Sequence, residues 1–269
     1  MTHHLHTLIA LLGLIPLAVA LGGCAAHKQG APALADRGFI FGEHPAGAET
    51  INYAVYVPRN YDALKPAPCI LFLHGKGESG TDGNKQIIQG LGSALLWNAA
   101  EWPCIVVLPQ KPDADRQWED DAPAVMEILA RIKERWSIDY ERVYLTGLSQ
   151  GGHGTWALAS MYPGTFAAIA PICGYARPMT PEHVATAVGN VPVWAFHGLA
   201  DDVVPPTGTT AITDALRRER AGKPGAAELK VSLFEGVNHG SWDRAYRESG
   251  LAPWLLAQRR ARAGAGTPR

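Results

Sequence analysis

The sequence has little excess charge and few cysteines. Its 269 residues include 24 Lys and Arg against 25 Asp and Glu, a formal net charge of −1, so it lacks the basic field with which proteins bind nucleic acids. Four cysteines in a chain of this length do not make a disulfide scaffold. The sequence also lacks a phosphate-binding loop, a dinucleotide fingerprint and metal-ligand spacing in its main body. We therefore expect no nucleic-acid partner, no metal and no other cofactor.

The N-terminal apolar run is shorter than the about 20 residues that a membrane helix needs. This run, Leu8–Leu21, has fourteen residues and lies in a segment, 1–23, without Asp, Glu, Lys or Arg, as is typical of a signal peptide. It ends in LGGC at Cys24, which resembles a bacterial lipobox. We expect a lipoprotein signal peptide over 1–23, lipidation of Cys24 and a tether over 24–37. A soluble secretory signal and an uncleaved anchor are the alternatives. The expected location is the bacterial cell envelope, on its periplasmic or outer surface, with the lipid as the sole membrane contact.

Short apolar runs alternate with helical patterns through the rest of the chain. Runs such as CILFL and CIVVL are typical of parallel strands buried on both faces. The expected strands are Phe39–Phe41, Ile51–Val57, Cys69–Leu73, Cys104–Leu108, Val143–Thr146, Phe166–Ile172, Val191–His197 and Leu229–Phe234. Helical patterns cover 84–100, Pro123–Trp136, Gly151–Met161, Thr207–Arg220 and Trp242–Gln258. The alternation predicts an α/β fold, one doubly wound and mostly parallel sheet of about eight strands over 38–258, followed by a flexible tail over 259–269.

Two cysteines begin expected strands. Cys69 and Cys104 would face one another if those strands are neighbours, and a disulfide between them is one interpretation. The preferred interpretation is that these two cysteines and Cys173 are small buried apolar residues.

A serine between glycines follows one of these strands and precedes a helix. The sequence Gly147-Leu148-Ser149-Gln150-Gly151 is G-x-S-x-G in the strand-to-helix context that the motif requires. Glycines are needed because neighbouring Cβ atoms would clash in such a tight, strained turn. The pattern predicts that Ser149 is a nucleophile at the carboxyl edge of the sheet.

A serine nucleophile needs a base, and the base needs an orienting carboxylate. On this kind of fold the chain order is Ser, then Asp or Glu, then His. Asp201 and Asp202 follow the strand that ends at His197, and His239 follows the next strand. The order is satisfied, so we expect His239 as the base and one of the two aspartates as its partner.

The chain resembles the α/β-hydrolase superfamily, in particular the bacterial phospholipase/carboxylesterase-like group often labelled predicted peptidases, which is related to acyl-thioesterases and feruloyl-type esterases. The resemblance covers about residues 39–257. The motifs that carry it are Tyr56-Val57-Pro58 with Tyr61, LHGKGESG at 73–80, GLSQGG at 147–152, HGLADDVVP at 197–205 and NHGSW at 238–242.

The resemblance assigns further roles. In these families the acid is the first Asp of D-x-x-V-P, which is Asp201 here, and Asp202 is the competitor. An oxyanion hole needs two backbone N–H groups. One comes from Gln150, the residue after the nucleophile, and the resemblance implies Lys76 as the other, with Gly75 as the alternative.

Other residues near the expected site have two readings. Trp118, Trp242 and His153 either contact substrate, lining its pocket, or serve in packing. We expect His74 and His197 to be structural histidines rather than second bases, and the acidic run at 119–121 to be a solvated helix start. We expect Glu78 to brace its loop, with a polar contact to substrate as the alternative. Only residues 173–190 separate two strands where related lipases insert a large cap. A large cap does not fit there, so we expect an open, shallow cleft.

These features predict a serine hydrolase that cleaves carboxylic esters through an acyl-enzyme, with a Ser149–His239–Asp201 triad. The resemblance favours short-chain or carbohydrate-linked esters of the feruloyl or acetyl type. A serine peptidase of the same fold is one alternative. A non-catalytic, surface-tethered binding lipoprotein is an alternative from another class. We expect a monomer or a homodimer.

Overall fold

The fold is centred on one sheet of eight strands. The computed structural model describes residues 37–260. Its strands are β1 (Gly38–Ala46), β2 (Glu49–Val57), β3 (Ala67–Leu73), β4 (Ile105–Gln110), β5 (Ile138–Leu148), β6 (Ala168–Ile172), β7 (Val193–Gly198) and β8 (Leu229–Phe234). They are arranged in the order β1-β2-β4-β3-β5-β6-β7-β8. Strand β2 is antiparallel to both of its neighbours and all other pairs are parallel. The predicted doubly wound, mostly parallel sheet is therefore confirmed.

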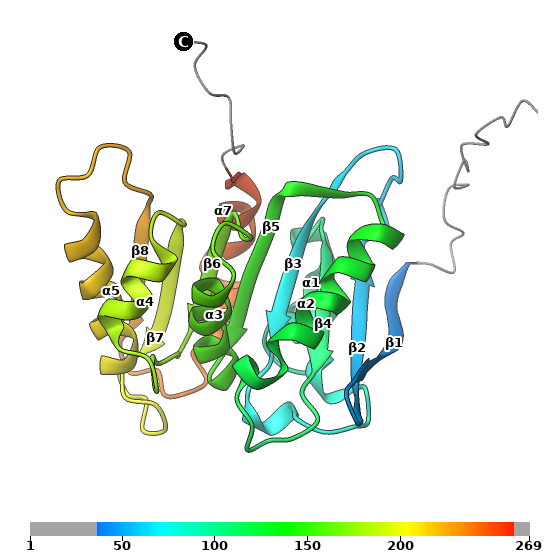
Figure 1. The fold of residues 1–269 in the computed structure, drawn as a ribbon, viewed down its shortest axis with the longest axis horizontal. Helices are drawn as coiled ribbons and strands as arrows, with labels where there is room; N and C mark the ends of the chain where they lie inside the picture. Colours follow the sequence, from blue (N-terminus) through cyan, green and yellow to red (C-terminus); the bar gives the residue numbers. More distant parts are fainter. Residues whose placement is uncertain (1–36, 261–269) are drawn as a thin grey trace, which may run out of the picture. The chain divides into compact units, whose positions relative to one another are not determined.

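Helices cover both faces of the sheet (Figure 1). One layer contains four helices that pack side by side, α2 (Trp118–Arg135), α3 (Gln150–Met161), α4 (Pro181–Val188) and α5 (Thr207–Arg220). The other contains α1 (Gly90–Asn98), α6 (Trp242–Arg247) and α7 (Leu251–Ala257). The parallel strands run toward the lower edge of the sheet in Figure 1, so the loops that follow them gather at that edge. This edge is where side chains from distant parts of the sequence meet.

The central strands are buried on both faces, as their continuous apolar sequences indicate. Every residue from Cys69 to Leu73 in β3 is fully buried. Because side chains alternate across a strand, Leu71 and Leu73 join the core under α2–α5, whereas Ile70 and Phe72 join the core under α1, α6 and α7. The sheet thus separates two hydrophobic cores, and strong burial on both sides fixes the position of each strand end.

The helices differ from the sequence predictions at four places. Helix α2 begins at Trp118 rather than Pro123, because Gln117 and Asp120 form a reciprocal capping box upstream of the proline. The pattern over 84–100 is one α-helix, α1, with short 3-10 turns on either side. The predicted final helix is divided into α6 and α7 by Gly250, which has a φ of 78°. Helix α4, which was not predicted, lies in the segment where related lipases insert a cap.

The three described cysteines, Cys69, Cys104 and Cys173, are buried and have free thiols, so the disulfide interpretation is wrong and the packing interpretation holds in this structure. Cys24, the expected signal peptide and the expected tether up to residue 36 lie outside the described residues. At the other end, the first two residues of the expected tail contact the folded domain. Arg259 forms ion pairs with Asp139 and Glu141 in β5, and Arg260 donates a hydrogen bond to the carbonyl oxygen of Gly164.

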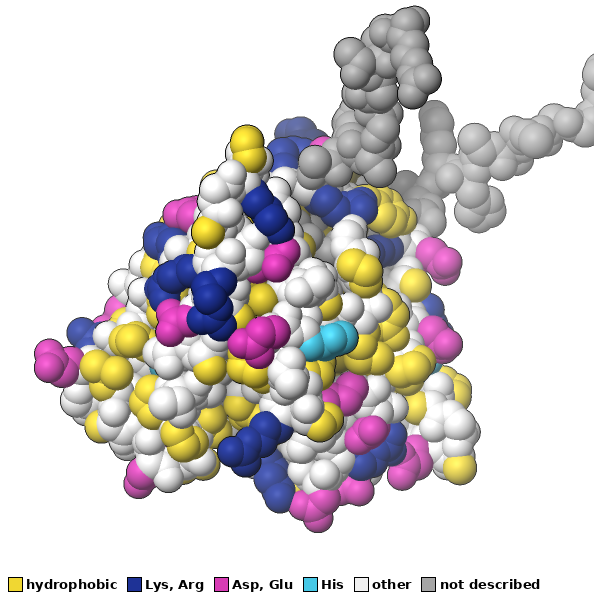
Figure 2. Space-filling model, turned by 60° about the vertical axis from the view of Figure 1, so that its left-hand side comes forward, with side chains coloured by type: hydrophobic (Ala, Val, Ile, Leu, Met, Phe, Trp, Pro, Cys, Tyr) yellow, Lys and Arg dark blue, Asp and Glu magenta, His cyan; other side chains and the backbone are white. Residues whose placement is uncertain are grey.

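Two surface properties of the described part bear on partners. Among residues 37–260, no helix combines the length and the apolar character that crossing a bilayer requires. Figure 2 shows the face that comes forward from the left of Figure 1, where basic and acidic side chains are interspersed. This mixture agrees with the net charge of −1.

Candidate active site

Ser149 lies in the turn between β5 and α3 with φ 55° and ψ −117°. This left-handed conformation is rare for a residue with a Cβ and marks a strained turn. The turn also brings backbones together. A Cβ on Gly151 would lie 2.0 Å from the carbonyl oxygen of Leu73, and one on Gly147 would lie 2.3 Å from the carbonyl oxygen of Gly151. The two glycines of G-x-S-x-G are therefore required by close approach of β3, β5 and α3.

A Gly151→Ala variant tests this close approach. We expect it to lower the free energy of unfolding by about 3 kcal/mol, since backbone atoms of β3 would have to move. The matched control is Gly77→Ala in the neighbouring loop, where an added Cβ meets nothing within 4 Å. Urea denaturation followed by circular dichroism measures both variants. Equal stability of the two would contradict the steric explanation.

The carboxyl edge brings together the three residues that sequence analysis selected. Ser149 follows β5, Asp201 follows β7 and His239 follows β8. His239 Nε2 lies 2.8 Å from Ser149 Oγ, and His239 Nδ1 lies 2.7 Å from Asp201 Oδ2. In this arrangement Nδ1–H donates to the carboxylate and Nε2 accepts from the serine hydroxyl. The imidazole is thereby oriented to remove the serine proton.

The surroundings of Asp201 favour its ionised form. Burial of its side chain alone raises the pKa, but hydrogen bonds from His239 and from the N–H groups of Val204 and Val203 outweigh burial and hold the pKa below its usual value. Both N–H groups donate to Oδ1 at 2.9 Å, which leaves Oδ2 for His239. Asp202 is exposed. The geometry therefore favours Asp201 over Asp202 as the partner of the histidine.

A buried histidine braces the Asp201 loop. His197 Nε2 lies 2.9 Å from the carbonyl oxygen of Val204 and 3.1 Å from Asp201 Oδ2, and its Nδ1 lies 2.7 Å from Thr209 Oγ1. Burial lowers the pKa of His197, so this ring stays neutral. Its contacts agree with the structural role expected from sequence.

The loop after β3 lies directly beside the nucleophile. A Cβ placed on Gly75 would be 3.5 Å from the Ser149 Cβ and 3.1 Å from Glu78 Oε2. Burial raises the pKa of Glu78, and hydrogen bonds from the N–H groups of Gly75 and Glu78 lower it in part. The next residue, Lys76, begins a 3-10 turn, and its N–H stays the predicted second oxyanion donor, with Gly75 as the alternative.

The backbone N–H of Gln150 is at the first residue of α3, where helical N–H groups lack internal partners. The Gln150 side chain donates to the carbonyl oxygen of Arg116 at 2.9 Å and so holds the loop after β4. The Lys76 side chain is exposed and pairs with Asp115 at 2.7 Å. Only the backbone of these two residues, Lys76 and Gln150, is therefore suited to oxyanion binding.

The pocket role predicted for Trp118 and His153 is wrong, because both side chains are fully buried. The Trp118 Nε1–H donates to the carbonyl oxygen of His74 at 3.1 Å. His153 stacks on Tyr175 with ring centroids 4.6 Å apart, and its Nε2 lies 2.8 Å from Glu119. Both residues support loops of the site and are not available to substrate.

Trp242 is the member of the predicted pocket that remains accessible. Its side chain is half-buried, and its ring meets that of His239 edge-on, with centroids 5.4 Å apart. The contact restricts the position of the imidazole and places an aromatic surface beside it.

The acidic start of α2 is not a solvated run. Asp121 is 3% exposed and pairs with Arg116, and Glu119 bonds to His153. Asp120 alone is exposed, and it caps the helix through Gln117. The three carboxylates thus fasten the loop between β4 and α2 to the catalytic edge.

Two side chains that sequence analysis did not connect to the site lie beneath it. Cys173 has a φ of 42°, and its Sγ accepts the Ser149 N–H at 3.3 Å. Lys111 is fully buried, and its Nζ donates to the carbonyl oxygen of Asp113. A cysteine at a strand end and a lysine in a polar loop have no distinguishing pattern, so neither was detectable.

Possible metal ligands are few in the described part of the chain. Donor atoms of Cys173, Asp201 and His239 lie within 4.8 Å of one another. Two of the three are already bonded to each other, and burial raises the pKa of the Cys173 thiol to about 12. The hydrogen-bonded triad thus uses the donors that a metal would need, and we assign none.

The lowered pKa of His74 makes the stability of the folded protein depend on pH. It is fully buried, its Nε2 accepts the N–H of Lys111 at 2.9 Å and its Nδ1 lies 2.6 Å from the carbonyl oxygen of Gly75. Burial lowers its pKa to about 3, whereas an unfolded histidine has a pKa of about 6.5. Between these values the unfolded chain binds a proton that the folded chain does not, so stability falls as pH is lowered.

We expect His74 to account for about 2–3 kcal/mol of the unfolding free energy lost between pH 7 and pH 4.5. A His74→Gln variant is expected to be less stable at pH 7 but to lose less on acidification, by that amount. The control is His183→Gln, at an exposed position on α4, which should keep the native slope. Urea denaturation across this pH range gives the slopes, and an unchanged slope for His74→Gln would refute the assignment.

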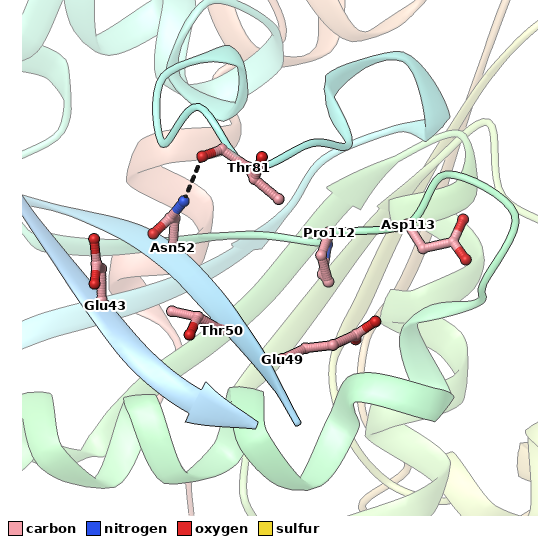
Figure 3. Close-up of a pocket in the computed structure, with 7 residues that line it drawn as sticks. All are labelled: Glu43, Glu49, Thr50, Asn52, Thr81, Pro112 and Asp113. Carbon is pink, nitrogen blue, oxygen red and sulfur yellow. Dashed lines mark hydrogen bonds between the residues drawn. The ribbon is translucent and has the colours of Figure 1, made fainter. Parts of the chain in front are cut away.

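A hollow on the same edge is separate from these residues. It is enclosed by the β1–β2 hairpin and the loops after β3 and β4, with a volume of about 450 Å³ (Figure 3). We call it the acidic hollow. Its lining residues are Glu43, Glu49, Thr50, Asn52, Thr81, Pro112 and Asp113. Asn52 Nδ2 donates to the Thr81 carbonyl oxygen at 2.8 Å across it. No triad residue lines it.

A strained serine in a strand–turn–helix, joined to a histidine and an aspartate from later strand ends, is the arrangement of an α/β-hydrolase. Comparison with known proteins gives the same class. Residues 46–261 match the Esterase family, described as "Putative esterase", and the chain belongs to this family.

Individual relatives found in the comparison are also named as esterases. The chain is 32% identical over 157 residues to the bifunctional acetylxylan esterase/xylanase of Neocallimastix patriciarum, covering 56% of this chain but only 21% of that protein. It is 27% identical over 198 residues to "Probable feruloyl esterase C" of Aspergillus flavus, covering 66% of this chain and 68% of the relative. A crystal structure of a thermostable esterase superposes with a TM-score of 0.72 at 27% identity, over 82% of this chain and 63% of that one.

Proposed function

We propose that the protein hydrolyses carboxylic esters through an acyl-enzyme formed on Ser149. The observation that carries this proposal is the position of His239, which lies within hydrogen-bond distance of both Ser149 Oγ and Asp201 Oδ2. A serine activated in this way is the nucleophile of acyl transfer. Membership of the Esterase family supports the same reaction.

In the proposed first step, Ser149 Oγ attacks the ester carbonyl carbon while its proton moves to His239 Nε2. The carbonyl oxygen becomes an oxyanion, held by the N–H groups of Gln150 and Lys76, each worth about 3–4 kcal/mol to the transition state. The tetrahedral intermediate expels the alcohol, which takes the proton from His239. Water then attacks the acyl carbon as His239 takes its proton, the bond from that carbon to Ser149 Oγ breaks, and the proton returns from His239 to Ser149 as the acid leaves. Asp201 stays ionised and stabilises the imidazolium throughout.

For substrate class we propose short-chain or carbohydrate-linked esters, such as acetyl and feruloyl esters of polysaccharides. Two observations support an open site that accepts a bulky alcohol. The segment between β6 and β7 forms only α4, which packs on α3 and α5, and Trp242 offers a half-buried aromatic surface beside His239. The names of the acetylxylan and feruloyl esterase relatives support the same class.

The test is a substrate panel on purified protein. It contains 4-nitrophenyl acetate, acetylated xylan, a feruloylated arabinoxylan fragment and a short peptide anilide. We expect hydrolysis of the esters, with labelling of Ser149 by a fluorophosphonate probe located by mass spectrometry. Cleavage of the anilide without ester hydrolysis would replace the proposal with a peptidase. Absence of both labelling and turnover would favour a binding protein.

We further propose that the enzyme is tethered to the bacterial cell envelope by a lipid on Cys24. The sequence LGGC that ends at this residue supports the proposal, and the lipid would be the membrane contact. Palmitate labelling in a bacterial host tests it. We expect label in the native chain and none in Cys24→Ser, and label in neither would exclude lipidation.

A further inference from the structure

A groove beside the Asp201 loop differs in character from the acidic hollow. Its volume is about 680 Å³, and it lies between the residues that follow β6 and those that follow β7, at the N-terminal ends of α4 and α5. We call it the Arg177 groove. The lining residues used below are Tyr175, Arg177, Met179, Val203, Pro205 and Ala211.

The walls of the groove are attached directly to the triad. The N–H of Val203 donates to Asp201 Oδ1 at 2.9 Å. Tyr175 lies two residues after Cys173, and the Sγ of Cys173 accepts the N–H of Ser149. The Tyr175 ring also stacks on His153, one turn into the nucleophile helix. No triad residue is in the lining, but the lining contacts the Asp201 carboxylate through Val203 and the helix after Ser149 through Tyr175.

The groove combines an apolar surface with one cation. Val203 is 65% exposed, Met179 is half-buried and Pro205 is exposed, so apolar surface is available to a ligand. Arg177 is exposed, and no carboxylate lines the groove. The Glu182 carboxylate on α4 is already paired with Arg218 at 3.1 Å. Arginine presents a planar fork of donors that matches a carboxylate.

We propose that the Arg177 groove binds a substrate arm that has a short apolar body and a carboxylate at its end. The inference rests on the proposed esterase function and adds a preference for anionic over neutral esters. The apolar body covers Val203 and Met179, and the carboxylate pairs with Arg177. The acidic hollow has three carboxylates in its lining, of which Glu49 pairs with Arg116. The two others disfavour an anionic arm there, whereas the groove has a cation.

The test compares matched neutral and anionic esters. For the acyl side the pair is 4-nitrophenyl pentanoate and mono-4-nitrophenyl glutarate. For the alcohol side it is 4-tolyl acetate and 4-acetoxybenzoate. We expect kcat/KM of one anionic ester to exceed that of its neutral partner by about tenfold, as one charge-assisted contact provides. The pair that shows the preference tells whether the acyl side or the alcohol side of the ester occupies the groove. Preference should fall as salt is raised, because the groove is open to solvent.

Two variants assign the preference to the groove. Arg177→Gln is expected to raise KM for the anionic ester about tenfold and to leave the neutral ester unchanged. Ala211→Glu, at an exposed helical position in the lining, adds a carboxylate and should have the same effect while Arg177 remains. The control Arg217→Gln removes an exposed arginine that pairs with Asp214 on α5 and should change neither ester.

The outcomes separate the two proposals. If the native protein hydrolyses none of the four esters, the proposed function fails. If it hydrolyses them but the ratio of anionic to neutral kcat/KM is the same in the native protein, Arg177→Gln and Ala211→Glu, the esterase function stands and the groove proposal is overturned.

Discussion

A Ser149→Ala variant is expected to lose about 10⁵–10⁶ of kcat on 4-nitrophenyl acetate while it keeps its fold. The loss is this large because the hydroxyl is the atom that forms the acyl-enzyme in the proposed mechanism, and residues of a triad act as a unit. Alanine has the same Cβ as serine, so the φ of 55° costs the same backbone strain in both proteins. The remaining rate comes from the oxyanion hole and substrate binding.

The matched control for this variant is Ser160→Ala. Ser160 lies in α3, the helix that begins directly after Ser149, and its Oγ donates to the Trp156 carbonyl oxygen at 2.8 Å. It should keep full activity with a similar thermal midpoint. Stopped assays with excess Ser149→Ala protein measure the residual rate, and fluorophosphonate labelling reports the nucleophile independently. A variant that retains more than a few per cent of native kcat would show that another group attacks the ester.

The second large effect is expected for Asp201→Asn, which should lower kcat by about 10⁴. The asparagine has the same shape, and its carbonyl oxygen can still accept the N–H groups of Val203 and Val204. Its NH₂ group then faces His239 Nδ1 and donates to it, so the ring takes the tautomer with a proton on Nε2. That tautomer cannot accept the proton of Ser149.

The adjacent aspartate provides the control for this effect. Asp202→Asn changes the same charge one residue along, on an exposed side chain, and should leave kcat within about twofold, as surface changes usually do. A pH–rate profile adds a second readout. Raising the pH should restore part of the Asp201→Asn rate, because hydroxide can then take the Ser149 proton that the wrong histidine tautomer cannot accept. Equal losses in the two variants would contradict the geometric choice of Asp201.

The sequence was sufficient for the sheet and for the relative order of the catalytic groups. Buried parallel strands such as Cys69–Leu73 have continuous apolar sequences, and the turn at Ser149 requires glycines, so both leave strong local signals. The distance between Ser149 Oγ and His239 Nε2 is a tertiary property, yet the chain order on a parallel sheet predicted their proximity because the carboxyl ends of such strands share one edge.

The errors concern side chains whose burial depends on neighbours. Trp118 precedes the predicted helix Pro123–Trp136, and the sequence leaves a pocket role and a packing role open for it. The capping box at Gln117 extends α2 upstream to Trp118, and the indole N–H donates to the buried His74 carbonyl oxygen. Asp121 was expected in solvent, but Arg116 pairs with it in the interior. Trp118 is buried against a group 44 residues away in the chain, and Arg116 and Asp121 meet only through the course of the loop that precedes α2, so the residues around either side chain do not reveal its burial.

The order of the strands has a consequence for when activity arises during folding. His239 lies 90 residues after Ser149 in the chain, and it is positioned by β8, the last strand, at the edge of the sheet. Contacts of such long sequence separation form late, because loop closure must precede them. His239 therefore reaches Ser149 only when β8 joins β7. A chain that has not yet formed this strand, or one that ends before it, is hydrolytically silent, and turnover reports the fraction of molecules that have completed the sheet.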